Sequence, residues 1–244
     1  MIAMVRRVCV LLAAFVSIAV MSGCATTLPE GHVLDSRDPY ESYNRSMFEF
    51  NTRVDEAVIK PVAQAYQSGV PKPIRTGVSN FFGNLSDLVS TVHHLLQAEG
   101  SKAGQSAGRV LVNTTVGILG LLDPATEMGI LKVSKEDFGQ TFGRWGAEPG
   151  AYIVLPFLGP STGRDAIGTV LDIATDPMGP LLDMETSGRV ATWGLKIIDM
   201  RSGLLELEPM IDTLSFDRYL SVRDAYLARR QQQVTNGEIP NPLP

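Results

Sequence analysis

Cysteine is nearly absent from this chain of 244 residues, which contains only Cys9 and Cys24. Both lie in an amino-terminal segment that has the pattern of a bacterial export signal, with two arginines before an apolar run at 8–21. We therefore predict that residues 1–23 are a signal peptide and that Cys24 becomes the acylated first residue of the mature chain. No thiol then remains for a disulfide, a metal site or a redox pair.

Long apolar runs are also absent, since none reaches the ~20 residues that a membrane-spanning helix needs. The run at 8–21 is too short to span, so an ordinary signal peptide or a short anchor is the alternative to lipidation. Acylation would hold the protein on a membrane, because each buried CH2 contributes about 0.8 kcal/mol. Ala25 follows the cysteine, and the lack of aspartate there resembles the outer-membrane address of bacterial lipoproteins.

An excess of basic residues is missing as well. Without residues 1–23 the chain has 19 basic and 26 acidic residues, a balance of −7. A nucleic-acid partner is therefore not expected. The phosphate-binding pattern G-x-x-x-x-G-K-[ST] does not occur, so we expect no nucleotide and no other cofactor.

The mature chain is expected to form one domain between two irregular ends. Residues 24–37, rich in Thr, Pro, Gly and Ser, are predicted to be a lipidated tether. Residues 38–230 carry the periodic apolar pattern of the folded domain. Residues 231–244, with three glutamines and three prolines, are predicted to be a disordered tail.

Helical periodicity dominates the domain. Asp38 is predicted to cap a helix, with Glu41 three residues later, and apolar residues then recur at spacings of three and four until Pro61. Further helices are predicted at 61–67, 73–82, 85–97, 101–116, 136–145, 163–175, 186–207 and 215–233. Thr162 with Asp165 forms a capping box at the start of the helix at 163–175. Three prolines between 149 and 160 favour a loop or one short hairpin there. The predicted fold class is therefore all-α.

Thirteen uncharged residues lie between Arg109 and Asp123, at 110–122. As a helix they would be about 20 Å long at ~1.5 Å per residue, which is too short for a hydrocarbon core of ~30 Å. We favour a buried core helix, and a segment that lies in one leaflet is the alternative.

One segment has the pattern of a serine hydrolase. Gly159 to Gly163 fits G-x-S-x-G with Ser161 as the nucleophile. In that class a histidine follows the serine along the chain, but the three histidines here are His32, His93 and His94. Ser161 is therefore interpreted as a turn residue at a helix start, and no catalytic residue is assigned. Adjacent His93 and His94 would point about 100° apart on a helix, so no metal site is expected either.

Five ordered blocks of sequence resemble the VacJ/MlaA family of outer-membrane lipoproteins. They are DPYESYNRSMFEFN, KPVAQAY with VPKPIRTGVSNFFGNL, LVNTTVGILGLLDPA, DFGQTFGRWGAEPGAYIVLPFLGPSTGRD and VRDAYLARR, and they extend from Asp38 to about Arg230. Five blocks in order behind a lipidation signal are more specific than any single motif.

The resemblance implies a ring or disc of short, broken amphipathic helices with a central channel, lying in the inner leaflet of the outer membrane and facing the periplasm. It implies that misplaced phospholipid passes inward through the channel and is handed to a soluble periplasmic carrier protein. It also implies a trimeric porin as a neighbour. The protein would then be a passive transporter and not an enzyme.

Within that frame the first helix and the segment 138–164 are predicted to form the wall and gate of the lipid channel. Polar groups there would solvate the headgroup, because an unpartnered polar group in hydrocarbon costs roughly 2–7 kcal/mol. The candidate residues are Asn44, Phe48, Phe50, Asn51, Phe138, Tyr152 and Arg164. The alternatives are a structural envelope lipoprotein that scaffolds porins without transport, and an esterase that uses Ser161.

Overall fold

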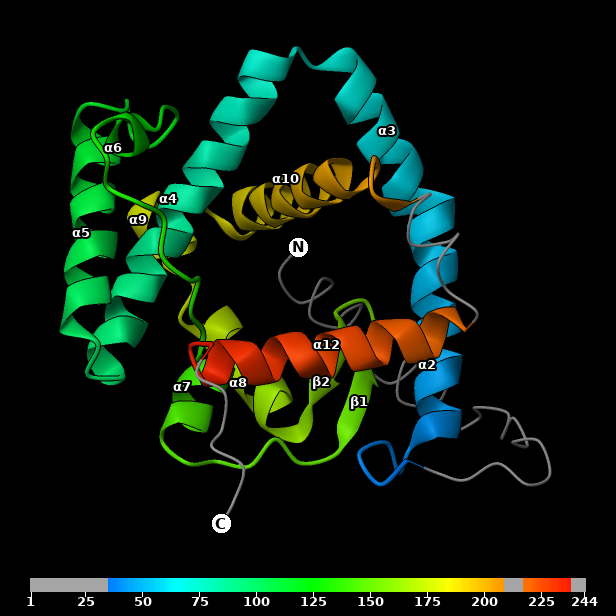
Figure 1. Ribbon diagram of the computed structural model, residues 1–244. Helices are drawn as coiled ribbons and strands as arrows, with labels where there is room; N and C mark the ends of the chain where they lie inside the picture. The colour runs from blue at the N-terminus through cyan, green and yellow to red at the C-terminus, as the bar shows by residue number, and fades with distance from the viewer. Residues whose placement is uncertain (1–34, 209–216, 238–244) are drawn as a thin grey trace.

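The computed structural model describes residues 35–208 and 217–237. The predicted signal peptide, Cys24 and most of the predicted tether lie outside these residues. The helices follow one another around the outline of a ring, and helix α10 lies across its middle (Figure 1). The expectation of a mostly helical chain is thereby confirmed.

One side of the ring is a nearly continuous helical arm. It consists of α2 (Glu41–Val54), the π-helical turn η1 (Asp55–Ile59) and α3 (Lys60–Gly69). The π turn lies directly before Pro61, which has no N–H group to continue a regular α-helical ladder. The helical pitch therefore changes just before Pro61, and the predicted helix at 61–67 continues directly from the first one.

The opposite side of the ring is a single helix, α4 (Lys72–Leu96), where we expected two. Gly83 lies inside this helix without interrupting it, because glycine destabilises a helix interior by only about 1 kcal/mol. Helix α5 (Gly100–Thr115) packs against α4 on the outside, and the short helix α6 (Pro124–Glu127) follows an irregular segment. The 25-residue α4 gives the ring a straight wall.

The base of the ring contains the one hairpin that we expected. Strand β1 (Tyr152–Leu155) pairs antiparallel with β2 (Gly159–Thr162). Helix α7 (Phe138–Arg144) precedes the hairpin and α8 (Gly163–Ala174) follows it. Thr162 caps α8 by accepting a hydrogen bond from the N–H of Asp165, as the capping-box pattern predicted.

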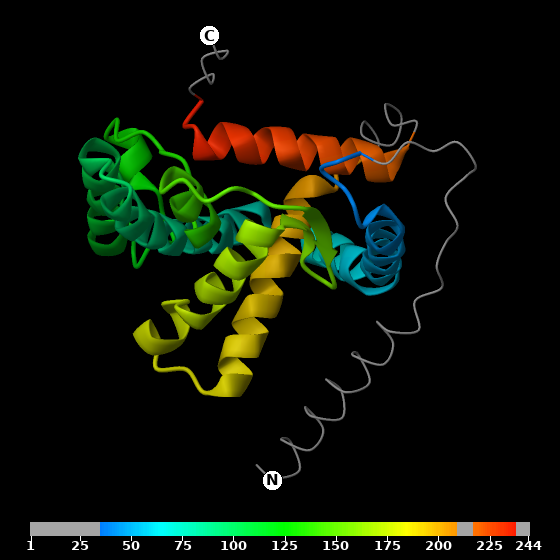
Figure 2. The ribbon, with the colours of Figure 1, turned by 90° about the horizontal axis from the view of Figure 1, so that it is seen from below.

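The last helices lie on opposite faces of this layer. Helices α8, α9 (Met178–Leu181) and α10 (Thr186–Leu204) project to one side, and α12 (Arg218–Val234) crosses the other side (Figure 2). Helix α12 ends at Val234, so the first residues of the stretch predicted as a disordered tail are helical. Residues 238–244 lie outside the described part of the chain.

Asp38 does not cap the first helix, contrary to the prediction. Helix α2 begins at Glu41 after Tyr40, without a side-chain cap. The fully buried carboxylate of Asp38 instead accepts hydrogen bonds from Asn44, Tyr219 and Arg223, and thereby ties the start of the domain to α12. A carboxylate that is taken out of water needs several such donors, which a helix N-terminus alone would not supply.

The interior of the described chain is unusually polar. Among the described residues, 8 hydrophobic residues are buried against 19 polar or charged ones, while 30 large hydrophobic side chains are exposed. Such a distribution is the reverse of that in a protein surrounded by water on all sides. It indicates that part of the surface faces an apolar medium or another protein.

Candidate functional site

The seven predicted site residues form two groups in the structure. Asn44, Phe48, Phe50, Asn51 and Tyr152 lie where α2 contacts the hairpin, as the bonds and rings below show. Phe138 and Arg164 lie in a polar network between α7, α8 and α12. The two groups meet at Tyr226, whose ring lies 6.1 Å from that of Tyr152 and whose hydroxyl donates to Asp165 at 2.8 Å.

Two asparagines of α2 hold the hairpin by its backbone. The amide of Asn44 donates to the carbonyl of Tyr152 (3.1 Å) and accepts from the N–H of Val154 (2.8 Å). The amide of Asn51 donates to the carbonyl of Leu155 (2.9 Å) and accepts from the N–H of Phe157 (2.7 Å). Because the two are seven residues apart, they lie on one face of the helix and fix both ends of β1.

The three aromatic residues of the first group differ in exposure. Phe48 and Tyr152 pack against Tyr219 in the hydrophobic core, with ring centroids 5.7 and 6.3 Å from it. Phe50 is exposed and meets Phe157 edge to face at 5.2 Å, at the tip of the hairpin. Phe157 has φ = +63°, a backbone conformation that is uncommon outside glycine. Of these rings, only the Phe50–Phe157 pair lies at the surface.

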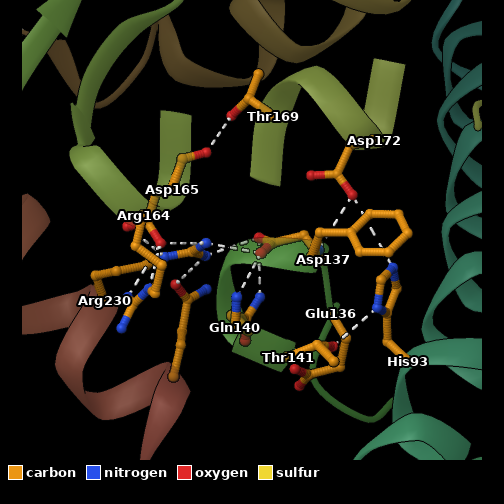
Figure 3. A network of polar contacts seen from close by, with 12 residues as sticks. His93, Glu136, Asp137, Gln140, Thr141, Arg164, Asp165, Thr169, Asp172 and Arg230 are labelled. Atoms are coloured by element: carbon orange, nitrogen blue, oxygen red, sulfur yellow. Dashed lines mark hydrogen bonds and ion pairs between the residues drawn. The ribbon is translucent and has the colours of Figure 1, made fainter. Parts of the chain in front are cut away.

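The second group is a polar network centred on Arg230 (Figure 3). Its guanidinium donates to both carboxylate oxygens of Asp137 at 2.6 and 2.7 Å and to Asp165 at 3.1 Å. Arg164, which is mostly buried, also donates to Asp165, at 3.0 Å. Burial acts to raise the pKa of Asp137 and Asp165, but the hydrogen bonds from Arg230 outweigh it and hold both values below the ordinary range.

Close helix packing brings this network together. A Cβ added to Gly139 would lie within 2.5 Å of Arg230 and Asp165, and one added to Gly168 would lie 2.5 Å from the backbone of Gly139. Glycine is therefore required at 168 for α7 and α8 to approach, while a side chain at 139 would displace the Arg230–Asp165 contact. This explains Gly139 in the DFG part of the fourth sequence block.

A large cleft borders the network on the side of α12. It has a volume of about 1010 Å³ and is lined by residues 36–37, the predicted gate segment between Gly143 and Arg164, and α12. Arg164 and Arg230 contribute charged groups to its wall, and Leu227 contributes apolar surface. The structure thus places Arg164 on a cleft wide enough for a small amphiphile. Phe138 packs instead against His93, with ring centroids 4.7 Å apart.

Asp172, at the other edge of the network, forms no ion pair with a lysine or an arginine among the described residues. It accepts a hydrogen bond from the N–H of Phe138 at 3.1 Å, and His93 Nε2 lies 4.0 Å from it. Burial raises the pKa of Asp172 to about 6 and lowers that of His93, so the imidazole supplies no charge near pH 7. Sequence reasoning missed Asp172, because nothing in its local pattern marks it.

Replacing Asp172 by asparagine should stabilise the protein near pH 7.5. A carboxylate whose pKa is raised on folding weakens the folded state as the pH rises from about 4 to about 6, and asparagine cannot ionise. The side-chain oxygen of asparagine can still accept the hydrogen bond from the N–H of Phe138. We expect a gain of about 1–2 kcal/mol in the free energy of unfolding at pH 7.5, measured by denaturant titration. At pH 4 the gain should vanish; a constant gain would contradict the titration of Asp172.

Ser161 lies directly ahead of α8, as expected, but it belongs to strand β2 and not to a turn. Its hydroxyl is buried and donates to the carbonyl of Thr162 at 3.3 Å, and Thr162 is the residue that caps α8. His93 and His94 lie on α4 and contact Thr141 and Glu99 respectively. Within residues 35–208 and 217–237 no three potential ligands gather around a common metal position.

The segment 116–122 is an exposed apolar loop, so the favoured prediction of a buried core helix is wrong. Helix α5 ends at Thr115, and the exposed apolar side chains of the loop are Val116, Ile118, Leu119, Leu121 and Leu122. Ile118 and Leu119 adopt φ = +54° and +56°, and a Cβ on Gly117 would lie 2.5 Å from a backbone oxygen of Asn113. The turn is strained, and its geometry directs the apolar side chains outward.

Most backbone N–H groups of the loop donate hydrogen bonds within the protein. The N–H groups of Gly117, Leu119, Gly120 and Leu122 all donate to carbonyls within 112–117. An irregular segment can enter a hydrocarbon region only if its polar backbone groups have partners in the protein. Within the described residues no helix combines the length and apolarity that crossing a bilayer requires. The loop is therefore suited to enter one leaflet, which was the alternative in the sequence analysis.

Comparison with known proteins places the chain beside a group of bacterial lipoproteins. The model of the family described as MlaA lipoprotein matches residues 36–233. An intermembrane phospholipid transport system lipoprotein of Haemophilus influenzae is 31% identical over 232 residues, covering 94% of this chain and 92% of the relative. The protein of the same name from Escherichia coli is 35% identical over 83% of this chain and 80% of its own length.

A solved structure resembles the fold closely. Its description is the structural basis for maintenance of bacterial outer membrane lipid asymmetry, and its TM-score with this chain is 0.71. The two are 33% identical, and the match covers 81% of this chain and 98% of the other.

Proposed function

The chain belongs to the MlaA lipoprotein family, and from this we propose that it removes mislocalised phospholipid from the outer leaflet of the outer membrane. In this proposal it passes the lipid to a periplasmic carrier and so maintains lipid asymmetry. Phospholipid transport is the role named for its relatives from Haemophilus influenzae and Escherichia coli.

The observation that carries the proposal is the apolar loop 116–122. Its apolar side chains are exposed, most of its N–H groups have partners within the protein, and its turn contains two residues with positive φ. The loop would anchor the ring in the periplasm-facing leaflet, together with acyl chains on Cys24. A protein held in this way reaches lipid without crossing the bilayer.

We propose that movement of the lipid is passive and involves no catalysis. Arg164 and Arg230 would contact headgroups in the cleft of about 1010 Å³, while acyl chains stay near Leu227 and the surrounding membrane. Phe50 and Phe157, held by Asn51, would act as a gate at the hairpin tip. A trimeric porin beside the ring completes the proposed assembly.

Replacing Leu119 by glutamate tests the membrane contact. Leu119 is two-thirds exposed, so glutamate adds a charge there without disturbing a packed core. Its φ is positive, and both leucine and glutamate carry a Cβ, so the backbone strain stays the same. We expect binding of the unacylated mature chain to phospholipid vesicles, measured by flotation, to fall about tenfold. Gln232→Glu, which adds the same charge on the polar helix α12, should leave binding unchanged. Equal losses in the two variants would contradict the loop as the contact.

Transport itself is tested in cells that lack the gene. Surface-exposed phospholipid should rise in these cells and return to normal when the wild-type gene is restored, but only partly with Leu119→Glu. If deletion leaves surface phospholipid unchanged while porin levels fall, the structural scaffold is the better description.

A further inference from the structure

A second, smaller cavity lies on the side of α8, α9 and α10, away from the cleft beside α12. It has a volume of about 250 Å³ and lies between α4, the segment before α7, α8, α9 and α10. Phe82, Met178 and Trp193 supply apolar wall. The volume is just below the roughly 300–1,000 Å³ of pockets for whole small ligands, so it suits one end of a larger molecule.

Two lysines on the wall of this cavity form no ion pair with an acidic side chain among the described residues. They are Lys135, before α7, and Lys196, on α10, whose ammonium lies 5.4 Å from the ring centroid of Trp193. Partial burial lowers the pKa of Lys135; attraction to Asp87 opposes this shift, and repulsion from Lys196 adds to it. An anionic group between the two would relieve that repulsion.

Of the four carboxylates on the cavity wall, two have side-chain partners and two accept only a backbone N–H among the described residues. Glu136 accepts hydrogen bonds from Ser134 and Gln97, and Asp137 is held by Arg230. Asp172 accepts the N–H of Phe138, and Asp176, in the turn before α9, accepts the N–H of Met178. Lys196 attracts Asp172 without forming an ion pair with it. The cavity therefore presents two lysines and two carboxylates, and none of the four has an ion-pair partner of lysine, arginine, aspartate or glutamate among the described residues.

We propose that this cavity binds the zwitterionic headgroup of a phospholipid that carries a phosphate and a primary ammonium group. The phosphate lies between Lys135 and Lys196, and the ammonium group faces Asp172. Ile173 lines the cavity and is partly exposed, so it offers apolar surface for the start of the acyl chains outside. The proposed function supplies only the class of molecule, a phospholipid; the choice of headgroup rests on the charges of the cavity.

The test uses the full chain in non-ionic detergent with two water-soluble headgroups, glycerophosphoethanolamine and glycerophosphoglycerol. The chain has two tryptophans, so Trp145→Phe leaves Trp193 as the reporter in the cavity wall. Glycerophosphoethanolamine should change the fluorescence of Trp193 in a saturable way. Isothermal titration gives the dissociation constant independently of the reporter.

Three variants then separate the two charged ends of the headgroup. Lys135→Met and Lys196→Met should each weaken binding of both compounds about tenfold. Asp172→Asn should weaken glycerophosphoethanolamine by a similar factor and change glycerophosphoglycerol less than about twofold. Lys72→Met, an exposed lysine in the first turn of α4, serves as the control and should change neither.

Each other result overturns the assignment. A fluorescence response that does not saturate excludes a binding site. If Asp172→Asn weakens binding of both compounds equally, the ammonium group is not recognised. If Lys72→Met weakens binding, the compounds are held by general charge attraction. This outcome can be separated from that of the proposed function. If restoring the gene returns surface phospholipid to normal but neither headgroup compound binds, only this inference is overturned. Binding without any effect of the gene on surface phospholipid overturns only the proposed function.

Discussion

Replacing Arg230 by methionine should lower the free energy of unfolding by about 3–5 kcal/mol at pH 7.5. The guanidinium is the shared partner of Asp137 and Asp165, with a two-pronged contact to Asp137. Methionine fills similar space but leaves two mostly buried carboxylates with too few donors. Denaturant unfolding followed by circular dichroism gives the change directly.

The pH dependence of this variant follows from the lowered pKa values of Asp137 and Asp165. A lowered carboxylate pKa contributes stability above the ordinary value near 4, and that contribution is lost as the pH falls through the folded-state value. The difference between wild type and Arg230→Met should therefore be full at pH 6–8 and shrink in acid.

Arg229→Met is the matched control, because Arg229 is the exposed neighbour on α12 and should change stability by less than about 0.5 kcal/mol. Arg230→Lys should recover part of the loss, since an ammonium group keeps the charge but not the two-pronged geometry. A loss in Arg230→Met no larger than that in Arg229→Met would contradict the central role of this network.

The sequence predicted the local features of the fold and missed those that depend on distant partners. The helix at 101–116, the hairpin near 149–163 and the Thr162 cap all follow from periodicity, proline spacing and capping within a few residues. Asp38 was assigned to a cap because its local pattern fits one. Its actual partner Arg223 lies 185 residues further along the chain, which no local pattern indicates.

The candidate site shows the same limit. Asn44 and Asn51 were recognised as polar residues of the first helix, but their role as clamps on β1 requires knowing that β1 lies against α2. Phe48 and Phe50, two residues apart, lie on different faces of α2, and only the structure separates the core ring from the exposed one. Asp172 and Lys135 line the same cavity because α8 lies near the segment before α7, and no local sequence pattern indicates this.

Arg109 is expected to hold the apolar loop 116–122 in position through its contacts with α4 and with the residue that follows the loop. It is 2% exposed and donates to Asp87 on α4 (3.0 Å), to Asp123 (2.9 Å) and to the carbonyl of Ile130 (2.8 Å). Asp123 directly follows the apolar loop, so Arg109 fixes the point where the chain leaves the loop. Arg109→Met should cost about 3–5 kcal/mol of the free energy of unfolding, because Asp87 and Asp123 lose their buried cation.

The effect on membrane binding separates positioning from mere stability. At a temperature where Arg109→Met is still folded by circular dichroism, its binding to phospholipid vesicles should already be several-fold weaker, because the loop has lost its support. Lys102→Met removes one charge from the same helix at a half-exposed position, where the ion pair to Glu99 contributes at most about 1 kcal/mol. That variant should bind vesicles as wild type does. Normal binding by folded Arg109→Met would mean that the strained turn holds its shape through its own backbone bonds alone.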